Sequence, residues 1–221
     1  MGEEMYLSLW AVLAASIALA IHYFRWLKRP ASHLRAVLKT IPVLLLVLYA
    51  GLSGAPALFV AALALGALGD ACLAYEGEPA FVAGLAAFLA SHIAYAALFW
   101  PSIEPSLLVA SAWRYTAAWI FVVLTGMTFF MLWRPAGRLA IPVAAYGVAI
   151  LAMALSALAV KPILPAAGAA LFVMSDTALA VQKFLVKPDA PVMARLKPFV
   201  WGTYFTAQLI FTLAIAGLPL S

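Results

Sequence analysis

The stretch ALGALGDACLA, residues 64–74, places Asp70 inside a run of apolar residues long enough to cross a bilayer. A similar pattern returns as ALFVMSDTALA, residues 170–180, around Asp176. Aligned on the aspartate, the two stretches share an Ala-Leu at the start and a Leu-Ala at the end. A charged group in hydrocarbon is costly, so an aspartate in such a run indicates a functional site.

The composition indicates an integral membrane protein. The 221 residues are 67% hydrophobic and 10% charged, whereas a soluble domain has about 45–50% apolar and about 25% charged residues. The net charge of +5 could suggest a nucleic-acid partner. The basic residues lie, however, in short loops between apolar runs, which is typical of topology signals. We therefore expect a lipid bilayer around the chain and no nucleic acid.

Apolar runs of membrane-spanning length recur along the whole chain. A spanning helix needs about 20 residues, and we predict an all-α integral membrane protein with eight transmembrane helices. We expect them near Met5–Phe24, Leu38–Leu52, Ala55–Tyr75, Pro79–Trp100, Trp113–Trp133, Leu139–Val160, Ile163–Phe184 and Phe199–Leu218. The second run is short and could extend back towards Arg35, and Pro42 is expected in its first turn.

Lys and Arg are distributed unevenly between the two sides of this arrangement. The loops after the odd-numbered predicted helices hold eleven of the 13 basic side chains, and the other side holds Arg114 and Lys161. This bias predicts that both termini are non-cytosolic. It places each aspartate about 9–10 Å above the cytosolic end of its helix. We expect a prokaryotic cell membrane and an active site nearer the cytosolic leaflet.

We expect one polytopic membrane domain, residues 1–221, with signs of two halves. The tripeptide Ile-Pro-Val opens the second predicted helix at residues 41–43 and the sixth at residues 141–143. Together with the repeated aspartate stretches, this predicts same-orientation halves of roughly 1–104 and 105–221. If the two carboxylates meet, one stays protonated while the other is a base, as general acid–base catalysis requires. The alternative is that each aspartate only bonds to a neighbouring helix.

Other polar and aromatic side chains fall on inward-facing stripes. In the fourth predicted helix, Phe88, His92 and Tyr95 are spaced by three and four residues. In the last, Tyr204 and Gln208 lie one turn apart. Each could contact a substrate, or could only pack and form interhelical hydrogen bonds. Lys39 could attract a phosphate group or extend into the interface. Paired metal ligands are missing, so we expect no metal and no cofactor.

The chain resembles the YhhN-like family of membrane proteins, which includes the lysoplasmalogenases. The resemblance depends on motifs that occur in order along nearly the whole chain. They are Gly69-Asp70 with Leu73, then Phe81, Gly84-Leu85, Phe88, His92 and Tyr95, then Gly168-Ala169, Leu171-Phe172, Ser175-Asp176 and Leu179-Ala180, and finally Tyr204 and Ala207-Gln208. Lys39 with Pro42 resembles a family pattern in which the Lys and Pro are more usually adjacent.

The resemblance implies hydrolysis of the vinyl-ether bond of a lysophospholipid, the lysoplasmalogen. The products would be a fatty aldehyde and a glycerophospho-alcohol. We predict that Asp70 and Asp176 supply the acid and the base, without deciding which is which. The substrate-binding candidates are Lys39, Phe88, His92, Tyr95, Tyr204 and Gln208, and the apolar tail is expected among Phe81, Phe88 and the Leu-rich faces.

Two other functional classes fit parts of the pattern. A proton-coupled transporter also uses paired halves with intramembrane carboxylates. An intramembrane aspartyl protease has a Gly-x-Gly-Asp motif, which Ala67-Leu68-Gly69-Asp70 approaches. In that class, however, Pro-Ala-Leu does not precede both aspartates, whereas Pro56-Ala57-Leu58 does so here.

Overall fold

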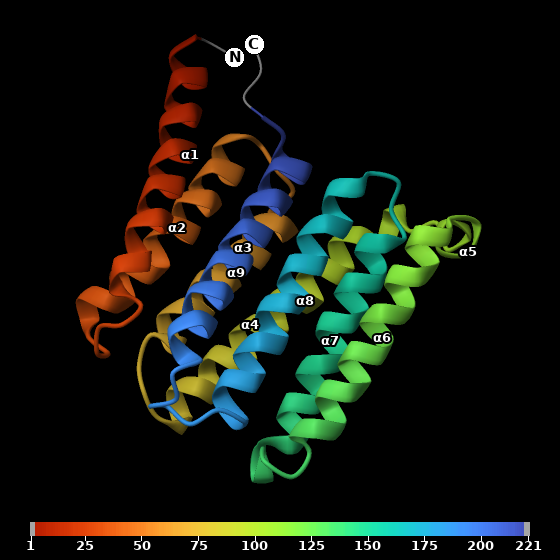
Figure 1. Cartoon of the computed structure of the whole chain (residues 1–221). Coiled ribbons are helices and arrows are strands. Elements are labelled where there is room, and N and C mark those ends of the chain that lie inside the picture. The colour runs from red at the N-terminus through yellow and green to blue at the C-terminus, as the bar shows by residue number, and fades with distance from the viewer. Residues whose placement is uncertain (1–2, 219–221) are drawn as a thin grey trace. The chain divides into compact units, whose positions relative to one another are not determined.

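The computed structural model describes residues 3–218, and all regular secondary structure in this range is helical (Figure 1). The α-helices are α1 Glu3–Tyr23, α2 His33–Leu52, α3 Ala57–Leu73, α4 Glu78–Phe99, α5 Ser106–Ala110, α6 Ala112–Leu132, α7 Ala140–Leu158, α8 Ile163–Phe184 and α9 Met193–Ala216. Short 3₁₀ turns lie at Phe24–Trp26, Trp100–Ser102 and Gly137–Leu139. The predicted all-helical class is therefore confirmed.

Within residues 3–218, seven helices are long and apolar enough to cross a membrane. They are α1, α2, α4, α6, α7, α8 and α9, the first, third and fifth of them together with adjoining turns. The remaining long helix, α3, has 17 residues and spans about 25 Å at the α-helical rise. This is the shortest length that a membrane helix takes. These seven helices correspond to seven of the eight predicted transmembrane segments.

The second helix begins earlier than hydropathy indicates. It starts at His33 because Ser32 caps it, its hydroxyl accepting a hydrogen bond from the Arg35 backbone N–H at 3.2 Å. Serine is a preferred N-cap because it satisfies a backbone donor that has no partner inside the helix. The prediction that Pro42 lies in the first turn is wrong. Pro42 is buried inside α2, nine residues after its start.

The last helix also begins before the predicted residue. It starts at Met193 rather than near Phe199, and Pro198 lies inside it. The added turns carry Arg195 and Lys197, whose charges lower the hydropathy without preventing a helix. Hydropathy alone therefore misplaces the start, because Arg and Lys are good helix formers.

The chain divides into two compact units, Met1–Ala94 with Gln208–Ser221, and Tyr95–Ala207. We call them the first and the second unit. In the first, α2 packs against both α1 and α3. The Tyr49 hydroxyl near the end of α2 donates to the Gly217 carbonyl oxygen at 2.7 Å. In the second, α7 packs against α6 and α8.

Hydrogen bonds from small polar side chains join the helices of the first unit. The buried Ser16 hydroxyl of α1 donates to the Pro42 carbonyl oxygen at 2.7 Å. The buried Ser91 hydroxyl of α4 donates to the Ala62 carbonyl oxygen of α3 at 2.8 Å. Both bonds are of the kind that joins helices in a bilayer, where no water competes.

Glycines bring α3 and α4 into close contact beside Asp70. A Cβ added at Gly69 would lie 2.5 Å from the Phe88 ring, and one at Gly84 would lie 2.6 Å from Leu73 Cγ and 3.3 Å from the Gly69 carbonyl oxygen. Small residues at such crossings let the backbones approach. The stretch around Asp70 is therefore held against α4.

In the second unit, Arg114 joins the start of α6 to the α7–α8 connection. It is 6% exposed, and its guanidinium donates to the carbonyl oxygens of Leu158, Val160 and Lys161, the last two at 2.7 and 2.8 Å. Carbonyls at a helix C-terminus have no partner within the helix, and a cation is favourable there. Arg114 thus occupies the first turn of α6 as a structural residue.

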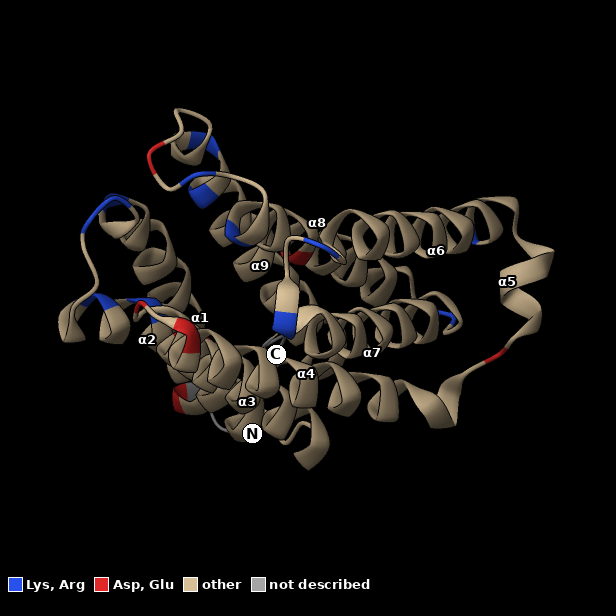
Figure 2. Ribbon diagram, turned by 90° about the horizontal axis from the view of Figure 1, so that it is seen from below, with Lys and Arg blue, Asp and Glu red and all other residues tan. Residues whose placement is uncertain are grey.

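Most of the described charged side chains lie on connections and near helix ends. In the first unit, Lys and Arg lie on the α1–α2 connection and the start of α2 (Figure 2). In the second unit they lie on the α6–α7 connection and from the end of α8 into the start of α9 (Figure 2). The long apolar middle parts of the helices are left to face lipid or one another.

Replacing Gly84 with Ala should destabilise the protein, because the added methyl group meets Leu73 and the backbone of Gly69. The overpacking should cost about 1–3 kcal/mol and lower the thermal unfolding midpoint in detergent. Gly51→Ala is the matched control, since nothing lies within 4 Å of a Cβ there. Equal midpoints for the two variants would contradict the close contact.

Replacing Arg114 with Met should remove three hydrogen bonds and leave buried carbonyls unpaired. We expect a loss of about 3 kcal/mol, read as a lower unfolding midpoint. Lys161→Met is the control, because its ammonium pairs with Glu104 at 2.9 Å in an exposed position and such pairs contribute little. If the unfolding midpoint of the control falls as much as that of the Arg114 variant, Arg114 is not a structural link.

Candidate functional site

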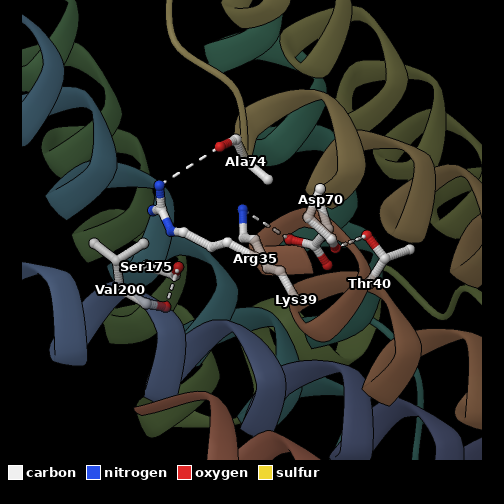
Figure 3. A network of polar contacts seen from close by, with 8 residues as sticks. Arg35, Lys39, Thr40, Asp70, Ala74, Ser175 and Val200 are labelled. Carbon is white, nitrogen blue, oxygen red and sulfur yellow. Dashed lines mark hydrogen bonds and ion pairs between the residues drawn. The ribbon is translucent and has the colours of Figure 1, made fainter. Parts of the chain in front are cut away.

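Asp70 lies near the end of α3 and forms an ion pair with Lys39 of α2. The Lys39 Nζ atom lies 3.2 Å from Asp70 Oδ1, and the two side chains are 16% and 1% exposed (Figure 3). A buried carboxylate requires such a partner, because an isolated charge in a low-dielectric interior is very unfavourable. Lys39, predicted to bind substrate, therefore has a partner within the protein.

The α2–α3 hairpin explains why these two residues meet. Lys39 lies as far before the last residue of α2, Leu52, as Asp70 lies after the first residue of α3, Ala57. Residues equally far from a tight connection lie at the same level in two antiparallel helices. The sequence contains this signal, but only once the helix ends are known.

Other polar contacts surround this ion pair. The Arg35 guanidinium of α2 lies 3.5 Å from the Ala74 carbonyl oxygen just after α3 (Figure 3). The Thr40 hydroxyl donates to the Ala36 carbonyl oxygen at 2.9 Å. His33 Nδ1 and the Tyr75 hydroxyl lie 2.8 Å apart. The contacts of Arg35 and His33 thus join the start of α2 to the residues that follow α3, beyond Asp70.

Asp176 of α8 has a different partner in the second unit. The Tyr146 hydroxyl of α7 donates a short hydrogen bond to Asp176 Oδ2. Tyr146 lies almost as far before the end of α7 as Asp176 lies after the start of α8, so the two are again level across a hairpin. Next to Asp176, the Ser175 hydroxyl donates to the Val200 carbonyl oxygen of α9 at 3.0 Å (Figure 3).

A pocket of about 380 Å³ lies between α6, α7 and α8, and Asp176 and Tyr146 line it. Apart from these two and three threonines, its lining is apolar or glycine. Apolar pockets with a few polar groups are the usual form of small-molecule sites. Tyr146 was not among the predicted site residues, and its level position opposite Asp176 is the signal that could have found it.

The two aspartates do not lie equally far from the ends of their helices. Asp70 is three residues before the end of α3 at Leu73, and Asp176 is eight residues before the end of α8 at Phe184. The expected equal distance of each aspartate from its helix end is therefore wrong. The reason is that α3 ends within one turn after Asp70, whereas α8 continues for about two more turns after Asp176. The direct pairing of Asp70 with Asp176 stays a prediction.

The remaining predicted site residues are all buried. In the first unit Phe88 packs against Gly69, one residue from Asp70, while His92 and Gln208 are fully buried. In the second unit Tyr95 is fully buried, and the Tyr204 ring lies edge-on to Phe172 at 5.4 Å. Among the described residues, no three His, Cys, Asp or Glu side chains gather as metal ligands would.

Comparison with known proteins finds relatives that are named lysoplasmalogenase. Lysoplasmalogenase TMEM86B of Sus scrofa is 31% identical over 209 residues, which cover 90% of this chain and 84% of that protein. The Homo sapiens protein of the same name is 29% identical over 211 residues, 92% of this chain and 85% of that protein. A lysoplasmalogenase of Mycobacterium bovis is 31% identical over 158 residues, 69% of this chain and 58% of that protein.

No solved structure matches the chain. The model of the YhhN family, in contrast, matches residues 34–215. This range includes Lys39, Asp70, Tyr146 and Asp176, and it runs from α2 to the last turn of α9. The chain therefore belongs to the YhhN family.

Proposed function

We propose that this protein is an intramembrane hydrolase that cleaves the vinyl-ether bond of lysoplasmalogens. The observation that carries the proposal is the similarity to proteins named lysoplasmalogenase over nine-tenths of the chain. The apolar helices support it, because a single-chain lipid would reach the protein from the bilayer. Two carboxylates held inside these helices supply groups for acid–base chemistry.

The reaction adds one water molecule across the vinyl-ether group. A proton adds to the outer alkene carbon, and an oxocarbenium ion forms next to the ether oxygen. Water then adds to the cation and loses a proton, which gives a hemiacetal. Its collapse releases a fatty aldehyde and the glycerophospho-alcohol. The protein must donate a proton, stabilise a cation and accept a proton from water, which are the roles of an acid and a carboxylate.

We assign these roles to Asp70 and Asp176 together. Asp70 faces the Lys39 ammonium at 3.2 Å and is 1% exposed, so as a carboxylate it is shielded from bulk water. Asp176 accepts from the Tyr146 hydroxyl, which holds its carboxyl group in one orientation at the pocket. The substrate-binding roles of Phe88, His92, Tyr95, Tyr204 and Gln208 remain part of this proposal.

We also propose that α3 is an eighth membrane span and that both termini are non-cytosolic. The His33–Tyr75 contact places the α1–α2 and α3–α4 connections at the same end of the first unit. This end carries the basic α1–α2 connection (Figure 2), and the excess of Lys and Arg supports a cytosolic location. Asp70, one turn from this end, would then lie nearer the cytosolic leaflet.

Asp70→Asn and Asp176→Asn should each abolish aldehyde release, because an amide can neither donate nor accept the proton that the reaction needs. We expect losses of at least about 100-fold, the lower range for a positioned acid or base. Free aldehyde from a lysoplasmalogen, measured by mass spectrometry with purified protein, is the readout. Near-normal turnover by either variant removes that aspartate from the mechanism.

The matched control is Asp189→Asn, since Asp189 lies in the α8–α9 connection outside the helices. It should keep wild-type turnover.

A wild-type protein that moves lysolipid across sealed vesicles without chemical change would instead support a transporter.

Replacing Lys39 with Met should leave the Asp70 carboxylate buried without its cation. Breaking a buried pair in this way costs about 3–5 kcal/mol, so the unfolding midpoint should fall, and turnover with it. Adding Asp70→Asn to this variant should restore much of the midpoint but no turnover. Lys28→Met, in the exposed α1–α2 connection, is the control. Additive midpoint losses in the double variant would contradict the ion pair.

A further inference from the structure

We infer that the pocket between α6, α7 and α8 is the site that binds the single hydrocarbon chain of a lysophospholipid. This inference rests on the proposed function and names the place of the substrate within the second unit. For the hydrocarbon tail, it is an alternative to the expected place among Phe81, Phe88 and the Leu-rich faces. Three independent features of the pocket support it. They are its volume, the hydrogen-bonded pair Asp176 and Tyr146 in its lining (the polar pair), and the arginines of the α6–α7 connection at one end (the basic end).

The volume of the pocket suits one chain. At about 380 Å³, it lies near the lower end of the range for pockets that hold one small molecule. Gly126 of α6 lines it, and a Cβ built there would meet nothing within 4 Å. The space beside this glycine is therefore open. Trp133 and Val148, also in the lining, are exposed on the protein surface, so a lipid chain can enter from the bilayer.

The polar pair lies where the ether end of the lipid would be. Tyr146 is six residues, or about 9 Å, from the start of α7 at Ala140. Asp176 and Tyr146 bond to each other in an otherwise mostly apolar lining. A carboxylate and a phenol recognise a hydroxyl group, and the glycerol of a lysolipid carries one next to its ether carbon. A diacyl lipid has an ester at that place and cannot donate.

The basic end lies at the α6–α7 connection. The pocket lining reaches Trp133, Ala136 and Ala140, and the exposed residues Arg134 and Arg138 lie between them in the chain. Arginine is well suited to bind phosphate. The start of α7 lies about 9 Å from Tyr146 along the helix. The long side chains of Arg134 and Arg138 can shorten this gap, so that one lysolipid headgroup places its phosphate at these arginines and its hydroxyl at Tyr146 and Asp176.

A photoreactive lysophospholipid with a diazirine in its chain tests the site directly. Purified full-length protein is illuminated with this probe, and the labelled peptides are mapped by mass spectrometry. We expect saturable labelling within residues 122–151 and 173–180. Excess unlabelled lysophospholipid should displace it, and excess diacyl phospholipid should not. Labelling elsewhere, or equal displacement by the diacyl lipid, overturns the inference in favour of ordinary bilayer contact.

Filling the pocket gives a second test. Gly126→Leu should lower the saturable labelling at least about tenfold, the effect expected when extra methylenes occupy an apolar pocket, and Gly126→Ala should lower it less. Gly51→Leu is the matched control, since Gly51 is a helical glycine with equally open space and lies outside the lining. Unchanged labelling in a folded Gly126→Leu protein overturns the inference. If the Leu variant fails to fold, unchanged labelling of the Ala variant overturns it instead.

Aldehyde release by the same proteins separates this inference from the proposed function. If the wild type is labelled in the pocket but releases no aldehyde, the lysolipid site stands and the hydrolase proposal fails. If the wild type and Gly126→Leu release aldehyde equally and the pocket is not labelled, the hydrolase stands and this site is wrong.

Discussion

A charged carboxylate inside an apolar helix must have a partner, and this requirement organises both units of the protein. Asp70 meets Lys39 and Asp176 meets Tyr146, in each case across a hairpin to the preceding helix. The partners lie at matching distances from their connections, so a tight hairpin is enough to bring them level. The two partners differ in chemistry, since Lys39 is a cation and Tyr146 offers a neutral hydroxyl.

Packing around these pairs depends on small residues and on backbone hydrogen bonds. Gly69 and Gly84 let α3 and α4 approach beside Asp70, and serine hydroxyls of α1 and α4 bond to backbone carbonyls of the facing helices. In the second unit, the Arg114 guanidinium donates hydrogen bonds to the carbonyl oxygens at the end of α7. In a bilayer these contacts replace the hydrophobic effect, which does not drive apolar helices together there.

The proposed chemistry uses the same features that make the carboxylates costly. Removal from water strengthens the electrostatic interactions of Asp70, and the proposed lipid substrate would reach both aspartates without leaving the membrane. The pocket in the second unit adds the specificity that a bare acid lacks. It offers one apolar space, one polar pair and a basic end, which together match a lipid with one chain, one free hydroxyl and one phosphate.

The sequence by itself determined the helical membrane class, most helix positions, the two aspartates within apolar runs and the family, because long apolar runs and charges within them are local features. It misplaced the starts of α2 and α9 and the position of Pro42, because capping by Ser32 and polar helical turns do not register in hydropathy. Only the tertiary structure decided that Lys39 faces Asp70, that Tyr146 faces Asp176 and that a pocket lies beside it. These facts depend on which residues of separate helices lie at one level, and that level is set by the ends of the helices and by their packing.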